Sequence, residues 1–502
     1  MGRFLLWCGL LLSACSGPSL VVVGEGVSPA PPVPEIEVVV VDHNGDPVAD
    51  ARVDFGGFDR SDTGSDGKVT SEWPRRPVTI EASAAGFHPR SVEVLELPAT
   101  RQVRVALEPV VVTGTVTDLS GKAVSWAAVS LGDAVASTKS DGSFELIRAL
   151  PGVISVSKAA FEPASFEWDG TEGVVTVALA PRTIKSVRAG GSAAGDEERW
   201  ADLLRLAEDT EINAVVIDTK DEAGTVFYNT RVETAHEIGA VRVKYRPEDL
   251  LADLKERDLY AITRIVAFQD NFLGTAFPEL AVGDSALGVP WETDRGQIWL
   301  DPTDRDSWTY PLALAEEACA LGYDEIQFDY VRFPSDGPVE RATFDGPSDP
   351  SGRSVAITGF LFEAKSRLNA MGCAVASDIF AVVLTSTGDQ GLGQQIEDLA
   401  AVVDVISPMI YPSHYSTGWF GFDCPNDHPG EVVGNALDDG MPRIPGPAIV
   451  RPWIQDFTFG CGGSYGEEEV RSQIDAVEER DLGWILWNVR SRFTESALEP
   501  GE

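Results

Sequence analysis

Two different hydrophobic patterns divide the chain near residue 183. Before that point, short stretches of alternating apolar and polar residues are separated by turn sequences such as NGDP and SGKA. This alternation is expected of strands with one buried face. After residue 183, continuous apolar runs alternate with segments whose apolar residues recur every three or four positions. The change predicts a multidomain chain, with an all-β N-terminal part followed by an α/β C-terminal part.

The C-terminal part contains eight strand-like apolar runs. They lie at 183–188, 213–218, 260–268, 323–329, 373–378, 403–408, 449–456 and 483–488. Helical segments fall between them, among them 197–208, 247–257, 307–321, 353–371, 394–401 and 467–480. Eight such units predict a (β/α)₈ or TIM barrel over 183–502. A doubly wound open sheet is the alternative, but no glycine-rich phosphate-binding loop follows the first strand.

The N-terminal part contains two weakly similar units, at 35–109 and 110–182. The first begins IEVVVVDHNGDPVADARVDF and the second VVVTGTVTDLSGKAVSWAAVSL. Alternating β-branched residues between turns predict a small antiparallel β-sandwich for each unit. Both resemble the carboxypeptidase regulatory-like (transthyretin-like) domain, which is seven-stranded and usually non-catalytic. The resemblance implies spacers or weak adhesion modules.

The first 15 residues are typical of a secretory signal peptide. Arg3 precedes an apolar run at 4–12, which is too short to span a bilayer. The run ends in Leu-Ser-Ala-Cys, which resembles the lipobox of bacterial lipoproteins, so Cys15 is expected to carry lipid that inserts into a bilayer. The Pro/Gly/Ser-rich segment 16–34 is expected to be a tether. We therefore expect an exported protein anchored to the cell envelope, and Ser16 rather than Asp favours the outer membrane.

Charge and cysteine content narrow the possible partners. A formal net charge of −40 disfavours nucleic acid and strongly anionic polymers. Beyond Cys8 in the signal and Cys15, four cysteines remain, and an even number in an oxidising compartment suggests two disulfides. We favour Cys424–Cys461 because both lie in loop sequence, with Cys319–Cys373 as the second pair. No CxxC spacing occurs, so zinc is not expected, while calcium bound to loop carboxylates is left open as a structural ion. No cofactor is expected.

Polar side chains recur where the predicted barrel strands end, which is where this fold places its active sites. Asp329 and Asp378 end the fourth and fifth strands, so they should approach each other and form the first candidate catalytic pair. Asp456, after the seventh strand, is a third candidate. Further residues at strand ends are expected to bind substrate: Asp218, Lys220, Asp221, Asp270, Arg332 and Gln455. A lone Asp at such a position can instead cap the following helix.

Aromatic residues lie in the same strand-end segments. Those expected to contact substrate are Trp299, Tyr411, His414, Trp453 and Trp487. Flat rings can stack on the faces of pyranose sugars, although aromatic residues more often belong to the core. Paired carboxylates suit glycoside hydrolysis, in which one acid protonates the leaving oxygen and another attacks or directs water. The sequence therefore favours a glycosidase that acts on a poly- or oligosaccharide.

The C-terminal part also resembles a family of glycoside-hydrolase-like TIM-barrel proteins. The resemblance runs through NAVVIDTKDEAG, ITRIVAFQDN, GYDEIQFDYVRFP, VASDIF, ISPMIYPSHY, RPWIQDF and GWILWNV. It implies the barrel fold and hydrolysis of glycosides, but it assigns neither the acid nor the nucleophile.

Two other functions compete with the glycosidase. A barrel that binds polysaccharide without cleaving it, or an envelope adhesion protein, would use the same aromatic residues but has no need of paired carboxylates. Metal-assisted hydrolysis is disfavoured because the chain has only five histidines and no HExxH motif. The sugar, the linkage, the stereochemical outcome and the oligomeric state are left open by the sequence.

Overall fold

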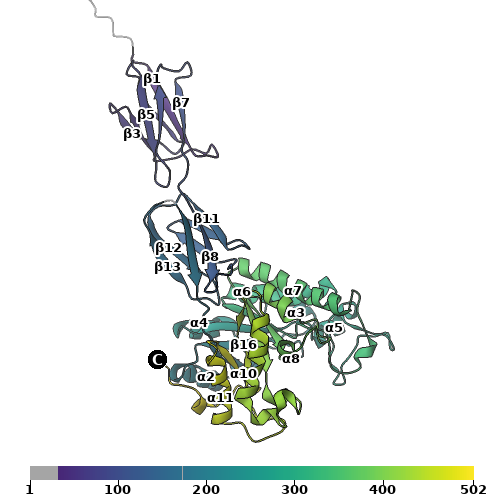
Figure 1. Cartoon of the computed structure of the whole chain (residues 1–502). Helices are drawn as coiled ribbons and strands as arrows, with labels where there is room; N and C mark the ends of the chain where they lie inside the picture. The colour runs from purple at the N-terminus through teal and green to yellow at the C-terminus, as the bar shows by residue number, and fades with distance from the viewer. Residues whose placement is uncertain (1–31, 172, 502) are drawn as a thin grey trace, which may run out of the picture. The chain divides into compact units, whose positions relative to one another are not determined.

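A computed structural model describes residues 32–171 and 173–501, which fall into two compact units. Within these residues the first unit ends at Pro109 and the second begins at Val110 (Figure 1). The signal peptide, Cys15 and most of the expected tether lie outside the described residues, so the lipid anchor stays a prediction. Among the described residues, no helix is both long and apolar enough to cross a bilayer.

The first unit consists of two small β-sheets. Its strands are β1 (Glu35–Val41), β2 (Arg52–Phe55), β3 (Arg60–Asp62), β4 (Lys68–Glu72), β5 (Val78–Ser83), β6 (Arg90–Val94) and β7 (Gln102–Ala106). The sheet orders are β4-β1-β7 and β3-β2-β5-β6. Buried and exposed residues alternate along β5, so one face of the strand packs inward. Side chains from both sheets, Val38 and Ile80 among them, share one hydrophobic cluster.

The same strand order recurs at the start of the second unit. Its strands are β8 (Val111–Asp118), β9 (Ala128–Leu131), β10 (Ala134–Ser137), β11 (Ser143–Ile147), β12 (Gly152–Ser157), β13 (Ala164–Trp168) and β14 (Val174–Leu179). They form sheets with the orders β11-β8-β14 and β10-β9-β12-β13. Each order matches that of the first unit with every strand number raised by seven. The described part of the chain therefore contains a structural repeat.

The remainder of the second unit is a closed barrel of eight parallel strands, as the apolar runs predict. The strands are β15 (Lys185–Ala189), β16 (Ala214–Lys220), β17 (Tyr260–Val266), β19 (Glu325–Asp329), β21 (Ala374–Phe380), β22 (Val405–Ile410), β23 (Ile449–Val450) with β24 (Trp453–Gln455), and β25 (Trp484–Trp487). Pairing of β21 with β22 closes the ring. The seventh strand is split because Pro452, which has no backbone N–H, interrupts it. Every residue of β16 and β17 is buried, which explains why apolar residues occupy both faces of these strands.

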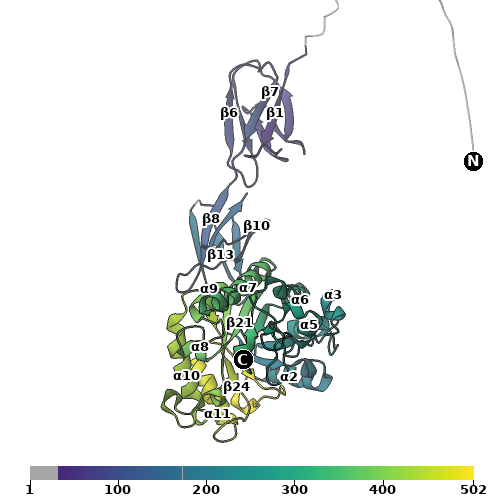
Figure 2. The ribbon, with the colours of Figure 1, turned by 90° about the vertical axis from the view of Figure 1, so that its right-hand side faces the viewer.

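Helices surround the barrel strands, as Figure 2 shows around β21 and β24. They are α1 (Gly191–Ala194), α2 (Glu197–Asp209), α3 (Glu233–Glu237), α4 (Pro247–Glu256), α5 (Asn271–Ala276), α6 (Thr309–Leu321), α7 (Pro350–Ala370), α8 (Val382–Thr385), α9 (Ile396–Val402), α10 (Pro429–Gly440) and α11 (Glu467–Glu478). A two-stranded ribbon of β18 (Gly283–Asp284) and β20 (Ala342–Thr343) lies in the connecting loops. Disulfides join Cys319 of α6 to Cys373 before β21, and Cys424 to Cys461 in two loops.

A buried ion pair joins the small β-sheets of the second unit to the barrel. Lys158 Nζ lies 3.2 Å from Asp404 Oδ1 and donates a hydrogen bond of 2.5 Å to Asn369 Oδ1. Ala160 belongs to one hydrophobic cluster with residues that begin β21 and β22, including Ala374 and Val405. Both contacts lie at the N-terminal ends of barrel strands. The β-sheets therefore stabilise the end of the barrel opposite its strand C-termini.

Replacing Lys158 should measurably weaken this junction. Lys158→Met leaves the buried Asp404 with only Lys365, 3.2 Å away, as its cationic partner. We expect the free energy of unfolding to fall by about 1–3 kcal/mol, below the 3–5 kcal/mol for a buried charge left unpaired. Urea denaturation of the full chain would measure the change. Lys122→Met is the matched control, because Lys122 Nζ reaches Gly446 O at an exposed site of the same junction. Equal losses of unfolding free energy in the two variants would contradict a stabilising role for the buried ion pair between Lys158 and Asp404.

Candidate active site

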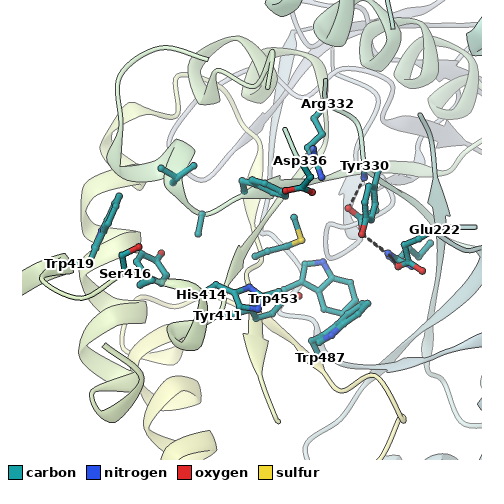
Figure 3. A pocket seen from close by; sticks show the side chains of 17 residues that line it. Glu222, Tyr330, Arg332, Asp336, Tyr411, His414, Ser416, Trp419, Trp453 and Trp487 are labelled. Atoms are coloured by element: carbon teal, nitrogen blue, oxygen red, sulfur yellow. Dashed lines mark hydrogen bonds and ion pairs between the residues drawn. The ribbon is translucent and has the colours of Figure 1, made fainter. Parts of the chain in front are cut away.

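A cavity of about 550 Å³ opens where the barrel strands end (Figure 3). Its wall is formed by Glu222, Arg264, Asp329, Tyr330, Arg332, Asp336, Phe380, Ala381, Val382, Met409, Tyr411, His414, Tyr415, Ser416, Trp419, Trp453 and Trp487. In Figure 3, Glu222 and Trp419 lie at opposite sides of the cavity, with Tyr411 and Trp453 between them. The C-terminal ends of β17, β19, β21, β22, β24 and β25 all contribute, which is the usual place for a barrel active site.

Asp329 faces this cavity from the end of β19 and is held in place by Arg264 of β17. Arg264 donates to Asp329 Oδ2 through Nε at 2.9 Å and through Nη2 at 2.6 Å. The backbone N–H of Tyr330 donates to Asp329 Oδ1 at 2.6 Å. Tyr330 adopts a φ of +52°, which is uncommon for a residue with a side chain. Such backbone strain is often found at functional sites.

Asp378 lies behind the cavity wall, and its hydrogen-bond partners differ from those of Asp329. Its Oδ1 accepts hydrogen bonds from Gln327 Nε2 at 2.8 Å and from Trp453 Nε1 at 2.7 Å. Its Oδ2 is buried and has no hydrogen-bond partner among the described residues. Burial, followed by the negative charge of Asp329, raises the pKa of Asp378 well above its usual range. Burial therefore favours the neutral form of Asp378, beside an Asp329 carboxyl group that is paired with Arg264.

Arg264 is the centre of a wider ionic network. Its Nη2 also contacts Glu222 Oε1 at 2.5 Å, and its Nη1 lies 3.5 Å from Asp218 Oδ1. Arg188 is the second partner of Asp218, with Nε 3.0 Å from Oδ1. Burial alone would raise the pKa of Glu222, but Arg264 lowers it to about 2. Glu222 is thus ionised at neutral pH and cannot supply a proton.

Aromatic rings form most of the remaining wall. Trp453 and Trp487 meet edge to face with ring centroids 5.3 Å apart, and Tyr411 lies 6.4 Å from Trp487. His414 packs on Tyr411 at 5.3 Å, and burial lowers the pKa of His414. Tyr415 and Trp419 continue the aromatic surface. This wall offers flat apolar faces next to carboxylates, as sugar binding requires.

Of the three candidate catalytic residues, only Asp329 belongs to the cavity wall. Asp378 touches that wall through Trp453. Asp456 instead accepts hydrogen bonds from the backbone N–H and the hydroxyl of Thr494, at 2.7 and 2.8 Å. It therefore anchors the C-terminal segment. Gln455 is buried and donates to Asn426 Oδ1 at 3.2 Å, while its own oxygen accepts from the backbone N–H of Ser413.

Five of the expected substrate-binding residues are in the cavity wall: Arg332, Tyr411, His414, Trp453 and Trp487. Arg332 lies with its guanidinium carbon 4.6 Å from the ring centroid of Trp299 and 4.4 Å from that of Phe380. Trp299 is buried behind it, 1% exposed. Trp299 thus orients the Arg332 side chain by packing against its guanidinium group.

The remaining expected residues form structural contacts next to the cavity. Lys220 and Asp270 make a fully buried ion pair of 2.9 Å, and Lys220 Nζ also donates to Val266 O. Asp270 further caps α5 by accepting from Leu273 N at 2.8 Å. Asp221 accepts from the backbone N–H of Ala223 and Thr225, and burial raises its pKa. Asp218 supports Arg264 from within the barrel.

The sequence expectations omitted Arg264, Arg188 and Glu222. The sequence contains a feature that points to each of these three residues. Arg264 and Arg188 interrupt otherwise apolar strands, in ITRIVAF and KSVRAG, and a buried arginine requires a carboxylate partner. Glu222 follows directly after the strand-end run DTKD. Among the residues that the structure describes, no group of His, Cys, Asp and Glu side chains is arranged to hold a metal ion.

Comparison with known proteins gives one family match. The model of a family described as "Putative glycosyl hydrolase domain" matches residues 187–493. A hypothetical protein from Ruminiclostridium thermocellum ATCC 27405 is 36% identical, covering 38% of this chain and 96% of its own, with a TM-score of 0.35. The glycoside hydrolase domain of PgaB (BpsB) from Bordetella bronchiseptica is 13% identical, covering 64% and 100%, with a TM-score of 0.47. The spore cortex-lytic enzyme SleL from Bacillus megaterium is 11% identical, covering 64% and 74%, with a TM-score of 0.38. No curated protein matches the chain.

Proposed function

Since the chain belongs to the family described as "Putative glycosyl hydrolase domain", we propose that its barrel hydrolyses a glycosidic bond of a poly- or oligosaccharide at the cavity around Asp329. One observation carries the proposal beyond the family. Asp329 faces the aromatic cavity and accepts two hydrogen bonds from Arg264, whereas Asp378 is buried behind the same wall and has a raised pKa. Glycosidases separate the roles of their two carboxyl groups by giving them different environments.

The proposed chemistry gives the two carboxyl groups different roles. Arg264 holds the Asp329 carboxylate at the cavity through two hydrogen bonds, while burial behind the wall raises the pKa of Asp378. Asp329 is the carboxyl group that faces the cavity, so in the proposed reaction it accepts a proton from the attacking water. The water oxygen bonds to the anomeric carbon as the bond to the leaving sugar breaks, and the leaving oxygen takes up a proton from solvent. Asp378 acts through Asp329 and is a positioning residue.

A screen of polysaccharides tests the activity itself. The purified chain would be incubated with neutral plant and bacterial polysaccharides, and new reducing ends would be counted. Asp329→Asn, assayed beside the native chain, shows whether any turnover belongs to this cavity. Release of reducing ends by the native chain but not by the variant supports the proposal. Equal release by both would assign the activity to another site or to a contaminant.

A binding protein without catalysis is the second candidate, and one contact favours it. A carboxylate held by two hydrogen bonds from Arg264 is a weaker base and nucleophile than a free one. In that case the native chain would bind a polysaccharide in affinity electrophoresis and would release no reducing ends. Turnover in the screen excludes this candidate.

The raised pKa of Asp378 predicts an alkaline limit to activity. The protonated carboxyl is present below the raised pKa and is lost as the pH rises through it. We therefore expect log kcat to fall with a slope of −1 above that pH. In Asp378→Asn the amide cannot titrate, so the same limb should disappear even if kcat is lower. A limb that persists in Asp378→Asn would show that another group controls it.

The N-terminal sequence supports a surface location. We propose that lipid on Cys15 anchors the chain to the cell envelope and that the two small β-sheet units act as β-sandwich spacers between the lipid and the barrel. Metabolic labelling of the producing bacterium with a tagged fatty acid would test this. The native chain should be labelled and Cys15→Ser should not. Equal labelling of both chains would overturn the anchor.

A further inference from the structure

A second cavity adjoins the candidate active site. It has a volume of about 570 Å³, and its wall includes Phe457, Phe459 and residues 488–490. His414 and Trp487 belong to the walls of both cavities. Each volume lies within the range of about 300–1,000 Å³ that is usual for small-molecule sites. The two hollows meet at these shared rings, so together they offer room for more than one sugar.

Aromatic rings continue without a break from the first cavity into the second. His414, which packs on Tyr411 in the first cavity, lies 5.9 Å from Phe459, edge to face. The ring centroid of Phe457 lies 5.8 Å from that of Tyr411, so Phe457 extends the same group of aromatic rings. Phe459 is 60% exposed and Val489 is 72% exposed. Apolar side chains that gather at the rim of a cavity indicate a binding surface.

The loop that carries Phe459 is held in place by covalent and polar contacts. Asn426 Nδ2 donates to Phe459 O at 3.1 Å and to Cys461 O at 2.7 Å. The Cys424–Cys461 disulfide ties the same loop to the segment after β22. An exposed ring on a restrained loop loses little freedom when a ligand covers it. The arrangement thus presents Phe459 to solvent in an ordered position.

We propose that the second cavity is an additional sugar subsite, so that a neutral polysaccharide chain lies across both cavities and is cleaved at an internal linkage. The inference rests on the proposed function for the position of the cleaved bond at Asp329. Apart from Arg490, the described residues of this wall carry no full charge at neutral pH. A chain with a net charge of −40 also disfavours an anionic polymer. Neutral sugars, whose apolar faces stack on rings, fit both facts.

Calorimetric titration of the full-length Asp329→Asn chain tests the subsite without turnover. The probes are dimers, tetramers and hexamers of five sugars: β-1,4-glucose, β-1,3-glucose, β-1,4-xylose, β-1,4-mannose and β-1,4-N-acetylglucosamine. We expect one of the five series to bind more tightly as it lengthens. Adding Phe459→Ala should weaken the hexamer by about 2–12-fold, the equivalent of one aromatic stacking contact. The dimer should bind as before. Phe362→Ala is the matched control, because Phe362 is 62% exposed on α7 and belongs to neither cavity.

Three results would overturn the subsite. These are a hexamer that binds no more tightly than the dimer in every series, the absence of binding by all the probes, and an equal loss for dimer and hexamer in Phe459→Ala. The outcomes also separate the two proposals. Binding that tightens with oligosaccharide length, without turnover by the native chain, would refute the hydrolase and support the additional subsite. Turnover by the native chain, with binding that does not depend on oligosaccharide length, would support the hydrolase and refute the additional subsite.

Discussion

Asp329→Asn should lower kcat by about 10²–10⁴-fold, the usual contribution of a positioned acid or base. The amide can neither carry the negative charge that pairs with Arg264 nor accept a proton from the attacking water. Its NH₂ group would also face the donors of Arg264. The measurement is the rate of reducing-end release on the polysaccharide that the native chain cleaves best.

Asp324→Asn is the matched control for this change. Asp324 precedes the strand that Asp329 ends, and its Oδ2 accepts from Ala261 N at 2.9 Å, at the opposite end of the barrel. We expect its kcat to stay within about twofold of the native value, as for substitutions remote from the chemistry. If both variants lose activity equally, the effect reflects damage to the strand. If Asp329→Asn keeps full activity, Asp329 is not the reacting carboxylate.

Arg264→Met should cause the largest loss of stability in the barrel, about 3–5 kcal/mol in the free energy of unfolding. The methionine fills a similar volume but leaves Asp329 and Glu222 without their cation, while Asp218 keeps only Arg188. Urea denaturation at pH 7 would measure the loss. Arg367→Met, which removes a half-exposed arginine with two carboxylate partners on the surface, should cost less than about 1 kcal/mol.

The deficit of Arg264→Met should depend on pH in a defined direction. Arg264 holds the pKa of Glu222 at about 2, below the value of about 4.3 in an unfolded chain. A depressed pKa contributes stability above the unfolded value and loses it as the pH falls towards the folded value. The difference between the native chain and the variant should therefore be full above about pH 5 and shrink between about pH 4.3 and 2. A stability difference that grows as the pH falls would contradict the role of Arg264 in lowering the pKa of Glu222.

Strand-end position alone was a partial guide to the site. Asp329, Asp270 and Asp456 all follow barrel strands, yet only Asp329 faces the cavity. Asp270 caps a helix and pairs with Lys220, while Asp456 binds Thr494, a residue 38 positions later. Such partners depend on how each loop folds back, and short-range patterns do not contain that information. The Asp270 side chain caps α5, which is the alternative that a lone Asp at a strand end also allows.

Hydrophobic patterning predicts the barrel, because a strand buried on both faces is apolar along its length and a helix buried on one face repeats its apolar residues every three or four positions. The same local chemistry indicates the carboxylates and aromatic rings that gather at strand ends. The raised pKa of Asp378 and the pairing of Asp329 with Arg264 follow only from the closed barrel. Arg264 and Asp329 are 65 residues apart in the chain, and their charges interact because neighbouring strands place them within 3 Å. Coulomb energy and desolvation depend on distances in space, so the folded structure alone sets which carboxyl group has its pKa raised.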